Sequence, residues 1–174
     1  MWVFGYGSLI WNPGFAYVEG HIARLDGWHR SFCMRSIHHR GTPTDMGLVL
    51  ALDEVAGARC DGVAFRVPAG AEDLTLRSLR ERELISSAYL EKWLPVTLPT
   101  GANADALAYV VDPHHDQYCG GLSLEEQARI IAHAKGGRGT NRDYLFSTAA
   151  HLDQLGIADP ELNWLVSRVT NLAS

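Results

Sequence analysis

The residues best suited to chemistry lie in a glycine-rich turn near the N-terminus. The turn, Gly5-Tyr6-Gly7-Ser8-Leu9, directly follows the strand-forming pair Val3-Phe4. Glycine lets the backbone turn sharply and lets a ligand approach the main chain closely. Successive backbone N–H groups without a ladder partner suit a carboxylate or a developing oxyanion. The turn therefore predicts a small anion-binding site, although a plain structural turn accounts for the same residues when they are taken alone.

Glu81 and Glu83 are candidate acid/base groups near the end of an expected helix. Arg82 separates them, so they cannot share one helical face, and at most one of them points at a given pocket. A solvated surface charge is the ordinary state of either residue. A glutamate turned inward against apolar residues has its pKa raised by burial, toward the value that a proton shuttle needs near neutral pH. Their spacing alone does not decide between them.

Other chemistry-bearing patterns lack residues that their mechanisms require. Gly136-Gly137-Arg138-Gly139-Thr140 has neither the preceding strand nor the lysine of a P-loop, and Gly5-Tyr6-Gly7 lacks the third glycine of a dinucleotide-binding turn. The pairs His38-His39 and His114-His115 have no partner at i+4 that completes a metal site. Ser8 lacks the following glycine of a nucleophile elbow. We therefore expect no metal and no cofactor.

Composition predicts a single domain over residues 1–174 that binds a small molecule. Hydrophobic residues make up 47% and charged residues 20%, and the formal net charge of -5 offers no basic surface for nucleic acid. The three cysteines are far apart and form no C-x-x-C pair, which fits reduced thiols in a cytoplasm. No export signal and no membrane-spanning run of roughly 20 apolar residues is visible. We expect a cytoplasmic protein, and its oligomeric state is left open.

The elements that must position these residues come as strands first and helices after. Alternating or continuous apolar runs predict strands over Phe15–Leu25, Trp28–Arg35, Gly47–Leu52, Cys60–Val67, Tyr89–Leu98 and Ala106–Val111. Asp26-Gly27 predicts a hairpin between the first two of these strands. A period nearer 3.6 residues predicts a helix over Ala71–Leu84.

The last third of the sequence is predicted to be helical. Ser123 with Glu126 is a capping box that opens a helix ending at His133. Two further helices are predicted to begin at Thr140, which has Asp143 three residues later, and at Asp159, which Pro160 follows. The fold class is α+β, with a small curled mixed sheet or β-barrel-like core flanked by helices.

Several motifs together resemble the ChaC family of γ-glutamylcyclotransferases, and the resemblance runs nearly end to end. They are Val3-Phe4-Gly5-Tyr6-Gly7-Ser8-Leu9-Ile10-Trp11, Gly27-Trp28-His29-Arg30-Ser31-Phe32, Cys60-Asp61-Gly62-Val63-Ala64-Phe65, Arg82-Glu83 and Asn141-Arg142-Asp143-Tyr144-Leu145. The W-N-P, C-D-G-V and N-x-x-Y-L segments are similar to the ChaC branch specifically. The resemblance implies a small β-barrel-like fold and a cofactor-free enzyme that cleaves glutathione into 5-oxoproline and Cys-Gly.

The resemblance also implies roles for particular residues. Tyr6-Gly7-Ser8-Leu9 would hold the γ-glutamyl group, and Glu83 would be the catalytic glutamate. The family pattern is Arg-Glu, a few residues, a small pair and then tyrosine, so the spacing to Tyr89 selects Glu83 over Glu81 and adds Tyr89 to the substrate-binding set. This chain has Ser87-Ala88 where many relatives show glycine before the tyrosine.

Two secondary substrate-binding candidates are Arg35 and Tyr144. A strand-end arginine pairs well with a carboxylate, and Tyr144 lies one turn into a helix whose N-terminus favours an anion. A structural role is the alternative for each of them.

Two other functions stay open beside glutathione cleavage. A cyclotransferase for other γ-glutamyl amides would share the glutamyl-holding turn and differ in the other half of the pocket. A non-catalytic γ-glutamyl-binding protein would also keep the turn, but the retention of Glu83 beside Arg82 argues against it, because a buried acid costs stability.

Overall fold

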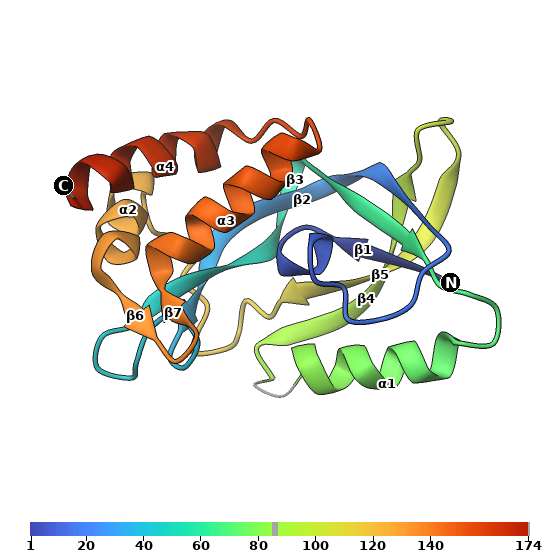
Figure 1. Cartoon of the computed structure of the whole chain (residues 1–174), viewed down its shortest axis with the longest axis horizontal. Coiled ribbons are helices and arrows are strands. Elements are labelled where there is room, and N and C mark those ends of the chain that lie inside the picture. The colour runs from blue at the N-terminus through green and yellow to red at the C-terminus, as the bar shows by residue number, and fades with distance from the viewer. Residues whose placement is uncertain (85–86, 174) are drawn as a thin grey trace. The chain divides into compact units, whose positions relative to one another are not determined.

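The computed structural model describes residues 1–84 and 87–173 (Figure 1). Their contacts divide the chain into two compact units, and each unit is built from two chain segments. The first unit comprises Met1–Arg30 and Ala51–Asp116, and the second comprises Ser31–Leu50 and Gln117–Ser174. Two long strands, β2 (Glu19–Ser36) and β3 (Gly47–Arg66), contribute residues to both units. The single domain over residues 1–174 stays a prediction.

A closed barrel with the strand order β1-β3-β2-β4-β5 forms the sheet. In the first unit β1 (Trp2–Gly5) pairs antiparallel with β3 and parallel with β5 (Asn103–Val111), and β4 (Tyr89–Thr97) pairs antiparallel with β5. Strands on both sides of β1 explain why Val3 and Phe4 are fully buried. The predicted α+β class with a barrel-like core is confirmed.

Two long strands replace the four short strands predicted between Phe15 and Val67. Strand β2 runs straight through Asp26-Gly27, so the predicted hairpin is wrong, and β3 likewise joins the two predicted strands on either side of Gly57. Gly27 and Gly57 have φ angles of 87° and 81°, in the left-handed region that glycine tolerates. Such residues bend a strand locally without reversing the chain.

Helix α1 (Glu72–Glu83) packs against the barrel of the first unit, and its last turn carries a predicted site residue (Figure 1). Leu76, Leu79 and Glu83 lie on one helical face, because they are spaced by three and four residues. Leu79 is 1% exposed and belongs to a core cluster with Tyr109 of β5. The apolar face of α1 therefore turns Glu83 toward the barrel.

The second unit is built mainly from three helices that begin as the sequence predicts. Its elements are α2 (Leu124–His133), β6 (Lys135–Gly136), β7 (Gly139–Thr140), α3 (Asn141–Gln154) and α4 (Pro160–Ala173). The side chains of Ser123 and Thr140 accept hydrogen bonds from the backbone at Glu126 and Asp143. Asp159 accepts one from Leu162 in the same way. The short β6–β7 ribbon was not predicted. No helix in the described residues is long and apolar enough to cross a membrane.

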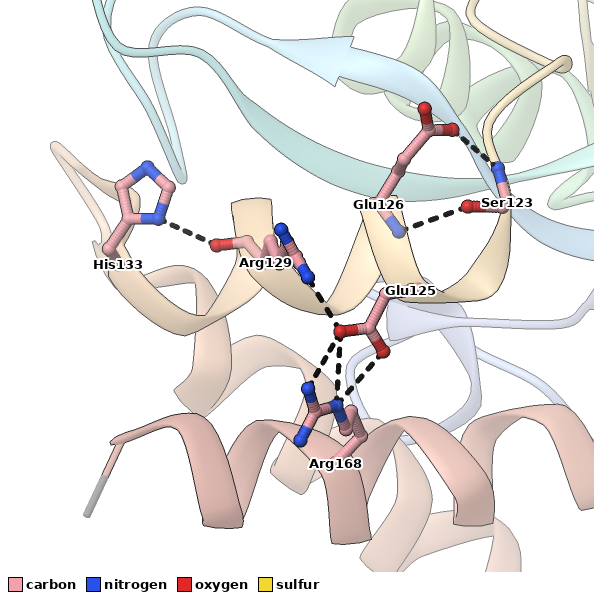
Figure 2. Close-up of polar contacts among 6 residues, drawn as sticks. All are labelled: Ser123, Glu125, Glu126, Arg129, His133 and Arg168. Carbon is pink, nitrogen blue, oxygen red and sulfur yellow. Dashed lines mark hydrogen bonds and ion pairs between the residues drawn. The ribbon is translucent and has the colours of Figure 1, made fainter.

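An ion-pair network ties α2 to α4 (Figure 2). The Glu125 carboxylate accepts hydrogen bonds from Arg168 at 2.8 and 2.9 Å and from Arg129 at 3.2 Å. The two guanidinium groups, Arg168 first, lower the pKa of Glu125 to about 2. The capping box of Ser123 and Glu126 lies beside this network, so the start of α2 is fixed both along the chain and across to α4.

The Asn141-x-x-Tyr144-Leu145 motif joins α3 to β3 inside the second unit. Asn141 is fully buried, and its side-chain amide exchanges two hydrogen bonds of 2.8 Å with the backbone of Leu48. Tyr144 Oη accepts a hydrogen bond of 3.3 Å from the Leu50 amide. These side chains bind backbone groups of β3, so this motif has a structural role.

Candidate active site

The glycine-rich turn leaves the barrel at the end of β1 and forms a short 3-10 helix, η1 (Ser8–Ile10). The Ile10 amide donates to the Gly7 carbonyl at 2.9 Å, and the Asn12 amide donates to the Ser8 carbonyl at 2.9 Å. The Ser8 and Leu9 amides precede Ile10, the first residue whose amide donates within the helix, so η1 itself offers them no hydrogen bond. The turn therefore ends a buried strand with backbone donors that η1 does not use.

Hydrogen bonds from two buried side chains hold this turn in place. Tyr6 is 8% exposed, and its hydroxyl donates to the Tyr109 carbonyl at 3.0 Å. Arg30 is 5% exposed, and its Nη1 donates to the carbonyls of Tyr6 at 3.1 Å and Asp61 at 2.9 Å. A trans peptide points its C=O and N–H in opposite directions, so fixing the Tyr6 carbonyl also fixes the Gly7 amide. The buried guanidinium thus orients one donor of the turn.

Arg82 connects the turn to the candidate acid. Its Nη2 donates to Ser8 Oγ at 3.0 Å, and its Nη1 donates to the Asn12 carbonyl at 2.6 Å. Its Nε lies 3.4 Å from Glu83 Oε1. The Arg82 side chain is 29% exposed, so water only partly screens these contacts. One side chain therefore supports the turn and places a positive charge beside Glu83.

Glu83 is the glutamate that turns inward. Its side chain is 17% exposed, whereas Glu81 is exposed to solvent. Burial raises the pKa of Glu83 above the usual value, and the positive charge of Arg82 opposes part of that rise. A carboxyl with a raised pKa holds a proton more readily near neutral pH, which suits a group that accepts and then donates one.

Tyr89 lies beside the same cluster. It begins β4 opposite Val111, and it packs, partly buried, against the core cluster that contains Leu9 and Leu79. Just before it, Ser87 has a φ of 58°, in the left-handed region that glycine prefers. Ser87 thus adopts a backbone conformation that is unfavourable for most residues with a side chain.

The second unit holds Arg35 and Tyr144. The backbone N–H of Arg35 donates to the Gln117 carbonyl at 2.7 Å, and the Gln117 side chain donates back to the Arg35 carbonyl at 2.8 Å. The Tyr144 ring packs edge-on against Phe32 and lies under the Arg40 guanidinium, 5.4 Å from the ring centroid. The first unit thus gathers Tyr6-Gly7-Ser8-Leu9, Glu83 and Tyr89, and substrate binding by Arg35 and Tyr144 stays a prediction.

Two buried residues of this region, Arg30 and Tyr109, were not predicted as site residues. Arg30 lies between Trp28 and the apolar residues Phe32, Cys33 and Met34 in a predicted strand, and an arginine at a buried strand position was a usable signal. Tyr109 lies in an apolar strand with no motif around it, so no local signal marks it. Among the described residues, no group of three or more His, Cys, Asp or Glu side chains is arranged to hold a metal ion.

Comparison with known proteins gives one consistent result. The sequence matches the ChaC-like protein family over residues 1–172. It is 41% identical over 172 residues to the glutathione-specific γ-glutamylcyclotransferase of Escherichia coli K12, covering 99% of this chain and 74% of the relative. It is 35% identical to γ-glutamylcyclotransferase 2-3 of Arabidopsis thaliana, covering 100% of this chain and 90% of the relative.

A solved structure shares the fold. The crystal structure of a γ-glutamyl cyclotransferase specific to glutathione from yeast superposes with a TM-score of 0.87. It is 23% identical and covers 100% of this chain and 99% of the yeast chain.

Proposed function

The chain belongs to the ChaC-like protein family, and we propose that it is a glutathione-specific γ-glutamylcyclotransferase that uses Glu83 as its general acid/base. Its substrate would be the small molecule glutathione, and its products 5-oxoproline and Cys-Gly. The observation that carries the proposal is the inward-facing Glu83, whose pKa is raised by burial and which Arg82 connects to the glycine-rich turn. A cytoplasmic location fits the three free cysteines, because reduced thiols are usual there.

The reaction requires proton transfer from the attacking nitrogen and to the leaving nitrogen. The α-amine of the γ-glutamyl group attacks its own γ-carbonyl carbon, so a new C–N bond closes the five-membered ring and the amide bond to cysteine breaks. The ammonium must lose one proton before it attacks and a second as the ring closes, and the leaving nitrogen must gain one to depart as an amine. The remaining proton passes to solvent or to that amine. Glu83 would take the first proton as a carboxylate and deliver it as a carboxylic acid.

The turn would fix the geometry of ring closure. We place the γ-glutamyl group against the backbone donors of Tyr6-Gly7-Ser8-Leu9, which suit its α-carboxylate or its γ-carbonyl oxygen. Holding amine and carbonyl together supplies up to about 7–11 kcal/mol, whereas a general acid/base contributes about 10²–10⁴-fold in rate. Positioning is therefore the larger demand, and the buried Arg30 and Tyr6 contacts that fix the turn serve it.

The test compares 5-oxoproline release from glutathione by the wild type, Glu83→Gln and Glu81→Gln. Glu83→Gln keeps the shape of the side chain and removes the titratable proton, so we expect turnover to fall by at least about 10²-fold. Glu81→Gln is the matched control, because it makes the same change two residues away on the exposed side of α1. We expect it to keep wild-type turnover.

Three results would contradict parts of the proposal. Equal turnover by the wild type and by folded Glu83→Gln would move catalysis to another acid. Wild-type release from a γ-glutamyl amino acid but not from glutathione would make the chain a cyclotransferase for other γ-glutamyl amides. No release from either substrate would leave a non-catalytic γ-glutamyl-binding protein.

A further inference from the structure

The Tyr109 side chain places a polar hydroxyl group in the buried core. Tyr109 is 2% exposed, and its hydroxyl oxygen has no hydrogen-bond partner within residues 1–84 and 87–173. A phenol hydroxyl has one donor and acceptor capacity, and buried tyrosines usually satisfy it. A buried polar group without a partner destabilises the fold, so an isolated one in a native core calls for an explanation.

The position of Tyr109 connects it to each segment of the proposed site. Its backbone carbonyl accepts the hydrogen bond from the Tyr6 hydroxyl. Its side chain belongs to the core cluster that includes Leu9 of the turn. Leu84, directly after α1, and Tyr89, the first residue of β4, pack against that cluster. The turn and the end of the helix that carries Glu83 thus meet around this tyrosine.

The hydroxyl is also kept in its neutral, proton-donating form. Burial is the main cause that raises the pKa of Tyr109, and the negative charges of Glu91 and Glu83 raise it further, against a smaller opposite effect of Arg80. Tyr109 and Glu83 also share neighbours, because Leu79 of the same cluster lies one turn before Glu83 on α1 and Leu84, which follows Glu83, packs against that cluster. Tyr109 therefore offers a fixed donor close to the proposed acid/base group.

We propose that the Tyr109 hydroxyl donates a hydrogen bond to the γ-carbonyl oxygen of the bound γ-glutamyl group, a role that rests on the proposed function. During ring closure the electron pair of the C=O bond moves onto this oxygen, and a donor placed there stabilises the transition state. Glu83 must reach the attacking and the leaving nitrogen, and both are bound to the carbon that carries this oxygen. A donor near Glu83 is therefore near the oxygen too, and the backbone donors of the turn remain for the α-carboxylate.

The test is Tyr109→Phe, which removes a single oxygen atom. We expect kcat for 5-oxoproline release from glutathione to fall about 10²-fold, as after loss of one oxyanion donor. We expect KM to change less than about threefold, because the interaction strengthens in the transition state. We also expect the melting temperature to rise by about 2–4 °C, because an unpartnered polar group is removed. Higher stability with lower kcat is not the signature of a purely structural side chain.

The matched control is Tyr17→Phe, which makes the same change on a tyrosine that is 48% exposed and packs against Phe65. We expect it to leave kcat and the melting temperature unchanged. The pH dependence of kcat/KM is measured for the wild type and Tyr109→Phe, because a hydroxyl bonded to Glu83 instead of the substrate would hold down the pKa of that acid.

Several results of these measurements would contradict the role proposed for Tyr109. A wild-type kcat in Tyr109→Phe overturns the inference while leaving the proposed function intact. The same holds if the acid limb of kcat/KM in Tyr109→Phe moves to higher pH while its plateau value stays that of the wild type. A lower melting temperature overturns it as well, because the hydroxyl would then have a structural partner. If the wild type itself releases no 5-oxoproline from glutathione, the proposed function fails, and this inference fails with it.

Discussion

Arg82→Met tests whether one arginine both supports the turn and tunes the acid. Methionine keeps a long side chain and a high helix propensity but removes the guanidinium. The change breaks the hydrogen bonds to Ser8 Oγ at 3.0 Å and to the Asn12 carbonyl at 2.6 Å. It also removes a positive charge 3.4 Å from the Glu83 carboxylate. Stability and catalytic pH dependence should therefore change together.

The expected loss of stability follows from those two hydrogen bonds. A hydrogen bond to a charged group contributes about 1.5–3 kcal/mol. The Arg82 side chain is 29% exposed, and solvent screening reduces each contribution to about 1 kcal/mol. The variant should thus be less stable by about 2 kcal/mol, which for a chain of this length lowers the melting temperature by about 4–8 °C.

The pH dependence has a definite sign. The charge of Arg82 lowers the pKa of Glu83, so its removal raises that pKa further above the usual value. Glu83 must be ionised to accept a proton from the substrate ammonium, so the acid limb of kcat/KM should move to higher pH. The assay is 5-oxoproline release across pH by the wild type, Arg82→Met and Arg77→Met, the last being an exposed arginine of the same helix.

Arg77→Met should match the wild type in both the melting temperature and the position of the acid limb. An unmoved limb in Arg82→Met, together with the loss of stability, would show that Arg82 acts only as a structural support. A limb that moves to lower pH would refute the electrostatic reasoning itself.

Two further predictions concern stability alone. Burial raises the pKa of Glu83. Its protonation therefore stabilises the fold fully below the unfolded pKa of about 4.3, and this contribution is lost as pH rises through the folded pKa. Glu83→Gln should thus melt at a higher temperature than the wild type at pH 7, with a gain that shrinks toward pH 4, and an equal gain at both pH values in thermal melts would contradict this. A Cβ on Gly62 would clash with the Gly5 carbonyl oxygen and would lie 2.7 Å from the Phe4 ring. Gly62→Ala should push β1 from β3 and cost about 1–3 kcal/mol in denaturant unfolding, and an unchanged midpoint would contradict this packing argument.

The helix starts were predictable from sequence because their signals are local. Ser123, Thr140 and Asp159 each accept a hydrogen bond from a backbone amide three residues later, so the whole interaction lies within one turn of chain. Nothing elsewhere in the fold is needed to form it. The capping pattern is therefore readable directly from the order of residue types.

The long strands were not predictable in the same way. Asp26-Gly27 has the composition of a hairpin turn, and Gly27 indeed adopts a positive φ. Whether a positive φ reverses the chain or only bends it depends on the strands that pair on either side, and that pairing is set by the closed barrel. A local turn signal carries no information about it.

The residues of the candidate site also differ in whether a local sequence signal marks them. The glycine-rich turn and Arg82-Glu83 could be proposed from motif and spacing, because the residues within each motif lie next to each other in the chain. Arg30 and Tyr109 contact Tyr6 across 24 and 103 residues of sequence, so their importance emerges only when the barrel closes. The inward orientation of Glu83 is intermediate, because the apolar spacing of α1 indicates it but only packing against the barrel makes it buried.

The distribution of unfavourable interactions supports the two proposed roles, proton transfer by Glu83 and substrate binding by Tyr109. Two buried side-chain atoms in the described residues lack a hydrogen bond, and one of them, Arg24 Nε, still lies 3.3 Å from an Asp26 carboxylate oxygen. The other is the Tyr109 hydroxyl, whose core cluster includes Leu79, one turn before Glu83 on α1. Burial opposes the ionisation of Glu83. Strain of this kind concentrates where a ligand or a reaction relieves it. The sign of the stability change should therefore distinguish residues that act on the substrate from residues that support the fold. Glu83→Gln and Tyr109→Phe should gain stability as they lose turnover, whereas Arg82→Met should lose stability because its hydrogen bonds are broken.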